Sequence, residues 1–172
     1  MRIHNYPANI TAPTILACEH GMKNLLVTLL SFGGDINAVD SNGQGAVHIL
    51  SLKGDVDMLQ WMKELDANLA ITDAKGNNGL HIAGRHGIME TAEYLVDQYV
   101  PLTHKNNKDE TPIELTRRIL DRTKNVEEFD TISNVFNIYS RHCNHPSPDR
   151  KRLRSPPTHK SASAGNARWE LS

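Results

Sequence analysis

The sequence contains few of the features that mark secreted, membrane-spanning or disulfide-stabilised proteins. Only two of its 172 residues are cysteines, Cys18 and Cys143, and they lie far apart. Two isolated cysteines do not predict a disulfide framework, so we expect an intracellular protein, cytoplasmic or nuclear. No run of about 18 apolar residues is present, and residues 1–7 lack the apolar stretch of a secretory signal. We therefore expect neither secretion nor membrane insertion.

Motifs for catalysis and cofactor binding are also missing. The sequence has no nucleophile elbow, phosphate-binding loop or dinucleotide fingerprint. Gly33-Gly34 follows a predicted helix, where such a pair ends the helix and turns the chain. Ser51 takes a small-residue position in a helix, as Gly84 does 33 residues later, so packing explains it better than nucleophilic chemistry. We expect no enzyme activity, no cofactor and no small-molecule substrate.

Charge is unevenly divided along the chain. Residues 1–142 contain 13 Lys and Arg against 18 Asp and Glu, which gives a net charge of −5. Residues 143–172 contain 6 against 2, which gives +4, together with several prolines and serines and almost no large apolar residues. Such a composition cannot bury enough apolar surface to fold. The sequence therefore predicts a folded body over 1–142 and a disordered basic tail over 143–172.

The tail carries a short basic run between two Ser-Pro pairs, Ser147-Pro148 and Ser155-Pro156. The run resembles a nuclear-import signal, and its basic residues are Arg150, Lys151, Arg152 and Arg154. The Ser-Pro pairs resemble proline-directed phosphorylation sites, where a phosphate would offset the basic charge. We expect nucleic acid contact, if any, only through this tail.

The main positive feature of the sequence is a period of 33 residues. The positions that recur at this step are His48 and His81, Asp40 and Asp73, Gly43 and Gly76, and the series Gly21, Gly54 and Gly87. Each period predicts a polar turn, a short helix ended by a glycine, and a second helix with apolar residues three and four apart. Neither helix is long enough to be stable alone, so neighbouring units must stack to bury their apolar faces.

These segments resemble ankyrin repeats, which have the same period and a Thr-Pro-Leu-His turn that opens the first helix. Thr111-Pro112 keeps the first two letters of that turn, and Val47-His48 and Leu80-His81 keep the last two or a close apolar substitute. Phe32–Ala38 resembles the Gly-Ala-Asp-Val-Asn segment of the family. The matching segments cover about residues 12–120. The resemblance implies an all-α ankyrin-repeat solenoid that binds other proteins.

The period divides the body into about four helix-turn-helix units, at 8–40, 41–73, 74–106 and 107–140. No clear turn precedes unit one, so either this unit is a cap that carries the polar Thr14, or the chain begins partway into a longer array. In unit four the first helix is expected over Pro112–Arg122, because no glycine stops it.

The second helix of unit four is predicted to be the C-terminal cap of the stack, with Asn125 as its N-cap. Apolar residues at steps of three and four give this helix one apolar stripe that would cover unit three; they are Phe129, Ile132, Phe136 and Tyr139.

The resemblance implies a structural role for two of the nine histidines. His48 and His81 take the family's turn position, where the imidazole ring clamps neighbouring turns by hydrogen bonds. The segment His142-Cys143-Asn144-His145 offers three metal-ligand types, but tetrahedral zinc needs four ligands in a fixed framework. We expect no metal site.

Positions that the fold leaves free lie on the turn tips and on the concave face, and we expect them to contact a partner protein. At the tips these are Ser41, Gln44, Lys75, Asn77, Asn107, Lys108 and Glu110. On the concave face they are Leu52, Lys53, Arg85, His86 and Arg118. The acidic body favours a partner with some basic character. The architecture is similar to that of small inhibitors of Rel-type transcription factors; the alternative is a targeting or assembly adaptor whose basic tail is the effector.

Overall fold

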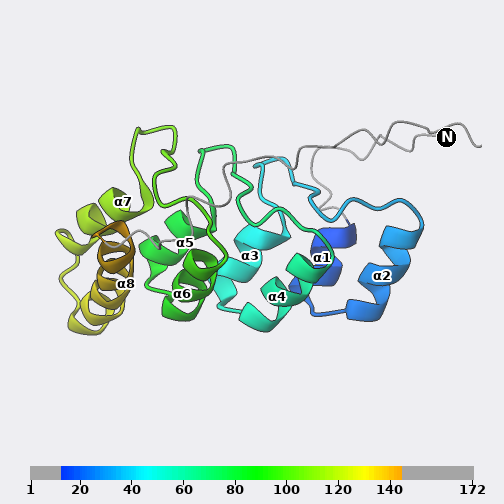
Figure 1. Ribbon diagram of the computed structural model, residues 1–172, viewed down its shortest axis with the longest axis horizontal. Helices are drawn as coiled ribbons and strands as arrows, with labels where there is room; N and C mark the ends of the chain where they lie inside the picture. Colours follow the sequence, from blue (N-terminus) through cyan, green and yellow to red (C-terminus); the bar gives the residue numbers. More distant parts are fainter. Residues whose placement is uncertain (1–12, 145–172) are drawn as a thin grey trace, which may run out of the picture.

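The computed structural model describes residues 13–144 as a row of paired helices. These residues form eight helices and no β-strand, with one isolated β-bridge between Val39 and Gly45. The helices are α1 (Pro13–Glu19), α2 (Lys23–Ser31), α3 (Ala46–Lys53), α4 (Val56–Glu64), α5 (Gly79–His86), α6 (Met89–Asp97), α7 (Pro112–Leu120) and α8 (Val126–Asn144). Figure 1 shows them stacked along one axis, which confirms the predicted all-α repeat solenoid.

The stack has two layers that position the turns. The first helices of successive pairs contact each other in the order α1, α3, α5 and α7, and the second layer contains α4, α6 and α8 in contact. Leucines from both layers fill the space between them, and Leu50, Leu59, Leu80 and Leu95 are fully buried. The turns that precede α3, α5 and α7 all project to the same side (Figure 1). Each turn is therefore held by the same packing at its base.

The ends of the helices follow the predicted chemistry in part. Gly54 and Gly87 end α3 and α5 with φ of 75° and 67°, the left-handed conformation that glycine adopts without strain. After α4 and α6 the same conformation falls on Asp66 and Tyr99, with φ of 61° and 60°. Their counterpart one step earlier is Gly33, with φ of 85°. Two turns of the stack thus impose a left-handed backbone on residues with a side chain.

The C-terminal end of the stack differs from the prediction in its boundaries. α7 ends at Leu120 and not at Arg122, because the Arg122 and Thr123 amides donate to carbonyls three residues earlier, those of Ile119 and Leu120, and the last turn tightens. Asn125 caps α8 as predicted, since its Oδ1 accepts from the Glu127 amide at 3.0 Å. α8 then continues to Asn144, past the predicted end of the body at residue 142. The predicted tail beyond it, with Arg150, Lys151, Arg152 and Arg154, lies outside the described residues.

α8 covers unit three by packing against α5 and α6, as its apolar stripe predicted, but the stripe contains different residues. Ile132 and Tyr139 are fully buried, together with Val135. Phe129 is 43% exposed, and Phe136 is half-buried beneath the Arg117 guanidinium at 5.2 Å. The buried side faces α5, α6 and α7 at once, so it is wider than a stripe that meets one helix. No helix within residues 13–144 is long and apolar enough to cross a lipid bilayer.

Candidate functional site

The three turns above the helices share one hydrogen-bonded design. In each, a side-chain oxygen at the same repeat position accepts two backbone amides from the residues two and four positions later. Asp40 accepts from Asn42 and Gln44, both at 2.8 Å. Asp73 accepts from Lys75 and Asn77, both at 2.8 Å, and Asn106 accepts from Lys108 and Glu110 at 2.9 and 3.1 Å. These hydrogen bonds hold the backbone of each turn tip, so the Cα positions that carry the outward side chains are fixed.

Neighbouring turns are also bonded to each other. The Ala74 amide donates to the Asn42 carbonyl at 2.9 Å, and one repeat later the Asn107 amide donates to the Lys75 carbonyl at 2.9 Å. The Asn107 side chain adds a bond from its Nδ2 to the Ala74 carbonyl at 2.9 Å. These bonds join the tips into a continuous ladder of hydrogen bonds. The ladder fixes the positions of the three turn tips relative to one another.

The two repeat histidines lie beneath this ladder and bridge successive turns. The Nδ1 atom of His48 accepts the Gly45 amide at 3.0 Å, and its Nε2 lies 3.2 Å from the Asn77 carbonyl. The Nδ1 atom of His81 accepts the Asn78 amide at 3.3 Å, and its Nε2 lies 3.0 Å from the Glu110 carbonyl. For His48, an amide donates to one ring nitrogen and a carbonyl faces the other, which fits a neutral ring with its proton on Nε2. His81 has the same backbone partners, and its Nδ1 also lies 2.7 Å from the Asn78 side-chain oxygen.

Burial sets the protonation of these rings. Both are almost inaccessible, and burial lowers the pKa of His48 and of His81 below the ordinary value, against the opposing effect of the carbonyls that their Nε2 atoms face. A folded-state pKa below the unfolded one means that the unfolded chain binds the protons more readily. The stability that the neutral rings contribute is complete above about pH 6.5 and is lost as the pH falls through the folded-state pKa.

Mild acid should therefore destabilise the protein through its histidines. Between about pH 7.5 and about pH 5 we expect the free energy of unfolding to fall, because His48 and His81 bind protons on unfolding. His86 contributes in the same direction, since partial burial and the nearby Arg85 lower its pKa as well. The lowered pKa values of the Glu110 and Glu114 carboxyls place their titration below this window. Urea unfolding at both pH values checks this. The double variant His48→Asn/His81→Asn should lose less on acidification than the wild type; an equal loss would refute the assignment.

A groove lies between the turns and the exposed faces of α3 and α5. Its volume is about 430 Å³. Ile49 and Ile82, which are equivalent positions of successive repeats, are partly exposed along it, and Leu52 beside them is 48% exposed. We call this hollow the concave groove. Its lining comes from two turns and from α1, α3 and α5, and it includes several of the residues predicted to contact a partner.

The structure divides the predicted contact residues into two groups. Those that line the concave groove are Gln44, Leu52, Lys53, Lys75, Asn77, Arg85 and His86, together with the clamp residues His48 and His81. Ser41, Asn107 and Lys108 are exposed on the turns but do not line it. Glu110 and Arg118 lie one repeat further along. The predicted contact residues that line the groove therefore come from the second and third repeats.

Asn77 is not a free contact residue, which corrects its place in the predicted set. Its side chain is 6% exposed. Its Nδ2 donates to the Asp73 carboxylate at 3.1 Å, and its Oδ1 accepts from the Asn106 side chain at 3.0 Å. Asn77 thus bonds one turn to the next, because the two turns approach closely where its side chain lies. Its amide belongs to the ladder and is not available to a partner.

Two of the predicted contact cations are already held by carboxylates. Arg118 forms a bidentate salt bridge with Glu110, in which Nη2 donates to Oε2 at 3.0 Å and Nε donates to Oε1. This pairing holds the pKa of the Glu110 carboxyl below its ordinary value. Lys53 Nζ donates to the Glu19 carbonyl at 2.8 Å and lies 3.6 Å from its carboxylate. Both pairs are partly exposed, so a partner can still reach them from outside.

Four groove residues are absent from the predicted contact set: Glu19, Ile49, Asp73 and Ile82. Ile49 and Ile82 recur at the 33-residue step, and Leu52 lies one helical turn after Ile49 on the same helix. Glu19 comes from α1 and reaches the groove only through its contact with Lys53. The repeat register would have revealed the isoleucines; nothing in the sequence marks Glu19. Within residues 13–144 no three His, Cys, Asp or Glu side chains gather in a metal-binding arrangement.

The sequence matches the model of a known protein family. The family model described as ankyrin repeats, in three copies, matches residues 14–109, which is more than half of the chain. The chain belongs to the ankyrin repeat family. The match covers α1 to α6 and the turn before α7, so it includes the whole concave groove. Ankyrin repeats are interaction modules, and the chain is accordingly a protein-binding repeat scaffold.

Individual relatives match part of the chain. The chain is similar to a transient receptor potential cation channel subfamily A member 1 homolog of Caenorhabditis elegans, with 26% identity over 104 residues, 60% of this chain and 9% of the relative. It is also similar to synphilin-1 of Mus musculus, with 31% identity over 105 residues, 54% of this chain and 11% of the relative. The chain thus spans about a tenth of the length of either protein.

Proposed function

We propose that this ankyrin-repeat chain is a non-catalytic scaffold that binds a partner protein through the concave groove and the adjoining turn tips. The observation that carries the proposal is the concave groove itself, where apolar side chains and exposed cations from two repeats lie on a rigid frame. The side chains there are not needed for the fold: Leu52, Lys75 and Arg85 are exposed. A preorganised surface of this kind binds without a large ordering cost.

Two partner classes agree with the sequence outside the groove. The small repeat body with its net acidic charge is similar in architecture to inhibitors of Rel-type transcription factors, which makes a transcription factor of that type one candidate partner. The alternative is a targeting or assembly adaptor, in which the repeats select a cargo and the basic run of residues 150–154 supplies nuclear import. The first class needs only the repeats, whereas the second needs the tail as well.

Paired variants test the proposal by separating stability from binding. The full chain would be immobilised, its partners captured from a cell extract and identified by mass spectrometry, and the affinity of the best-retained partner measured for purified variants. Lys75→Ala and Arg85→Ala should each weaken binding by about 1–3 kcal/mol and leave the melting temperature unchanged, because both side chains are solvated. Lys63→Ala on α4 is the matched control, and it should change neither quantity.

The clamp histidine provides the opposite comparison. His81→Ala should remove about 1–3 kcal/mol of stability, because the backbone groups that its ring faces are left unpaired. It should weaken binding only as far as it lowers the folded fraction. If the His81 variant stayed fully stable yet lost the partner or an activity, the structural role of this residue would be wrong. Partner binding that survived both groove substitutions would refute the proposed site.

A further inference from the structure

The concave groove differs in charge from the rest of the body. Residues 13–144 contain 12 Lys and Arg against 18 Asp and Glu, a net charge of −6. The two first helices that form the groove, α3 and α5, contain two cations, Lys53 and Arg85, and no carboxylate. The two second helices behind them, α4 and α6, contain five carboxylates and one lysine. In the two central repeats, the cations of the first helices therefore lie on the groove side, and the carboxylates lie mainly on the second helices.

The carboxylates that do reach the groove are occupied by the protein itself. The Asp73 carboxylate accepts the Lys75 and Asn77 amides and the Asn77 side chain, which holds it against its own turn. Glu19 pairs with Lys53. By contrast, neither Lys75 nor Arg85 forms an ion pair with any carboxylate of residues 13–144. The charges that the groove offers to a ligand are therefore positive, although its neighbours are mainly acidic.

An apolar floor accompanies these cations. Ile49 and Ile82 are partly exposed at equivalent positions of the two repeats, and Leu52 is 48% exposed next to them. Two unpaired cations are too few for a typical nucleic acid surface, which neutralises several phosphates. A groove that combines a few cations with apolar contacts fits a protein segment that has carboxylates and at least one large apolar side chain.

Residues 1–12 and 145–172 do not have the composition of such a segment. Residues 1–12 contain no Asp or Glu, and residues 145–172 contain six Lys and Arg against two acidic residues. A basic tail has the same sign as the groove and is repelled by it. The occupant that the charges favour therefore belongs to another protein.

We infer that the concave groove recognises an acidic segment of the partner protein, with carboxylates near Lys75 and Arg85 and an apolar side chain against Ile49 and Ile82. This inference rests on the proposed function, since it names the chemistry of the partner at the same site. It reverses the expectation drawn from the average charge of the body, which favoured a basic partner. The average is dominated by the second helices, which lie on the other layer.

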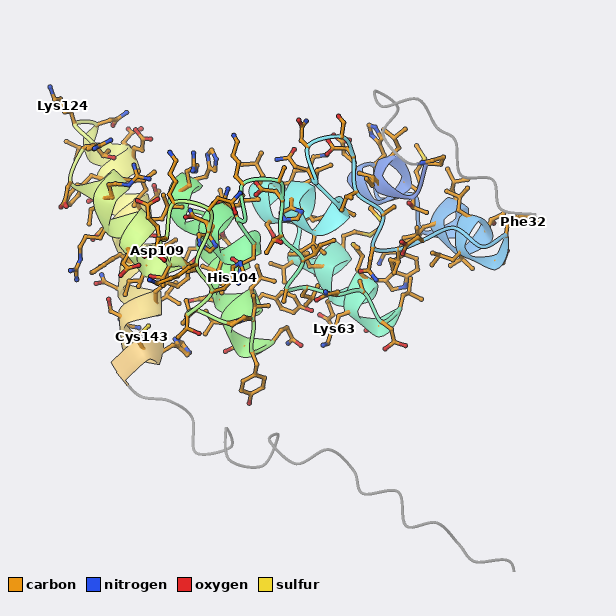
Figure 2. All side chains as sticks on the ribbon, turned by 90° about the horizontal axis from the view of Figure 1, so that it is seen from above. Phe32, Lys63, His104, Asp109, Lys124 and Cys143 are labelled. Atoms are coloured by element: carbon orange, nitrogen blue, oxygen red, sulfur yellow. The ribbon has the colours of Figure 1, made fainter. Side chains whose placement is uncertain are left out.

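Selection from a random-peptide phage library on the full chain tests the inference directly. Enriched peptides should carry an excess of Asp and Glu and a large apolar residue. The synthetic peptide should bind at least about tenfold more weakly to Lys75→Glu/Arg85→Glu, because like charges then face each other. Its affinity should also fall as salt rises. Lys63→Glu, at the edge formed by the second helices in Figure 2, makes the same charge change per residue away from the groove and should leave the affinity unchanged.

Reselection on Lys75→Glu/Arg85→Glu gives a second readout, and the acidic excess should disappear from the enriched peptides. Thermal melts of each variant exclude unfolding as the cause. Neutral or basic peptides, no enrichment, or displacement of the peptide by a tighter-binding random oligonucleotide would each overturn the inference. Peptides that bind in the groove without acidic residues would overturn the inference alone and leave the proposed function standing. Failure of the natural partner to respond to the groove variants would instead contradict the proposed function.

Discussion

Replacing Tyr139 by alanine should destabilise the protein by about 3–5 kcal/mol, because it opens a large cavity at the centre of the C-terminal stack. The ring is fully buried between α8 and α5, and its hydroxyl donates to the Leu80 carbonyl at 2.6 Å. Burial also raises the pKa of this phenol, so it stays a hydrogen-bond donor throughout the physiological range. A loss of this size is a large part of the stability of a small domain, and urea unfolding would measure it.

Two control variants separate the contribution of the Tyr139 ring to stability from that of its hydroxyl and from a general effect of removing an aromatic ring from α8. Tyr139→Phe should cost only about 0.5–1.5 kcal/mol, since it removes one hydrogen bond and keeps the packing. Phe129→Ala removes another aromatic ring from the same helix, but that ring is 43% exposed, so its loss should cost less than about 1 kcal/mol. If Tyr139→Ala were as mild as Phe129→Ala, α8 would not pack across α5 as described.

Gly84→Ala is expected to destabilise by about 1–3 kcal/mol, although the same change in an exposed helix would stabilise by about 1 kcal/mol. A Cβ atom at Gly84 would overlap the Thr116 hydroxyl and lie 3.1 Å from the Tyr139 ring. The hydroxyl cannot move away freely, because it donates to the Pro112 carbonyl at 2.7 Å. The close approach of α5 to α7 therefore depends on the missing side chain. Thermal and urea unfolding would give the sign of the change.

A rescue variant tests the cause of this effect. Thr116→Ala removes the atom that a Cβ at Gly84 would meet first, so the double variant Gly84→Ala/Thr116→Ala should lose less stability than the sum of the two single changes. Strict additivity would mean that the clash is not responsible. Stabilisation by Gly84→Ala alone would show that α5 and α7 are further apart than the structure has them.

The repeat could be predicted because its local signals all agree in phase. These signals act through backbone groups of nearby residues, so the sequence alone reveals them. They are the glycines Gly54 and Gly87, the polar turns at Asp40 and Asp73, and the N-cap Asn125. The same register places the first helices together and their turns on one side. Local chemistry with a fixed period is therefore enough for the fold.

The side-chain pairings between repeats were beyond the sequence. Asn77 was predicted to contact a partner because it lies at a turn, yet it is buried by its bonds to Asp73 and to Asn106 of the next turn. Within unit four, Arg118 of α7 pairs with Glu110 of the preceding turn, eight residues away along the chain. Such contacts depend on how closely a turn approaches the next turn or its own helix, and the repeat pattern does not encode that distance. The set of free contact residues could only be narrowed from the structure.

The charge of the site could have been found in the sequence but was hidden by averaging. The net charge of residues 1–142 mixes first helices, second helices and turns, which face different directions. When charges are assigned by repeat register, Lys53 and Arg85 fall on the groove side, and the carboxylates of α4 and α6 fall on the other layer. The face of a solenoid, and not its total charge, determines which partner it attracts.

The central claim, that partners bind on the concave groove, is tested most directly by an NMR titration of the full chain with a captured partner fragment. Amide shifts in the ¹H–¹⁵N spectrum should change most in the turns around Gln44 and Lys75 and in α3 and α5, with little change in α4 and α6. The Lys75→Glu/Arg85→Glu variant should abolish those changes. Shifts concentrated in α4 and α6, unaffected by that variant, would contradict the account.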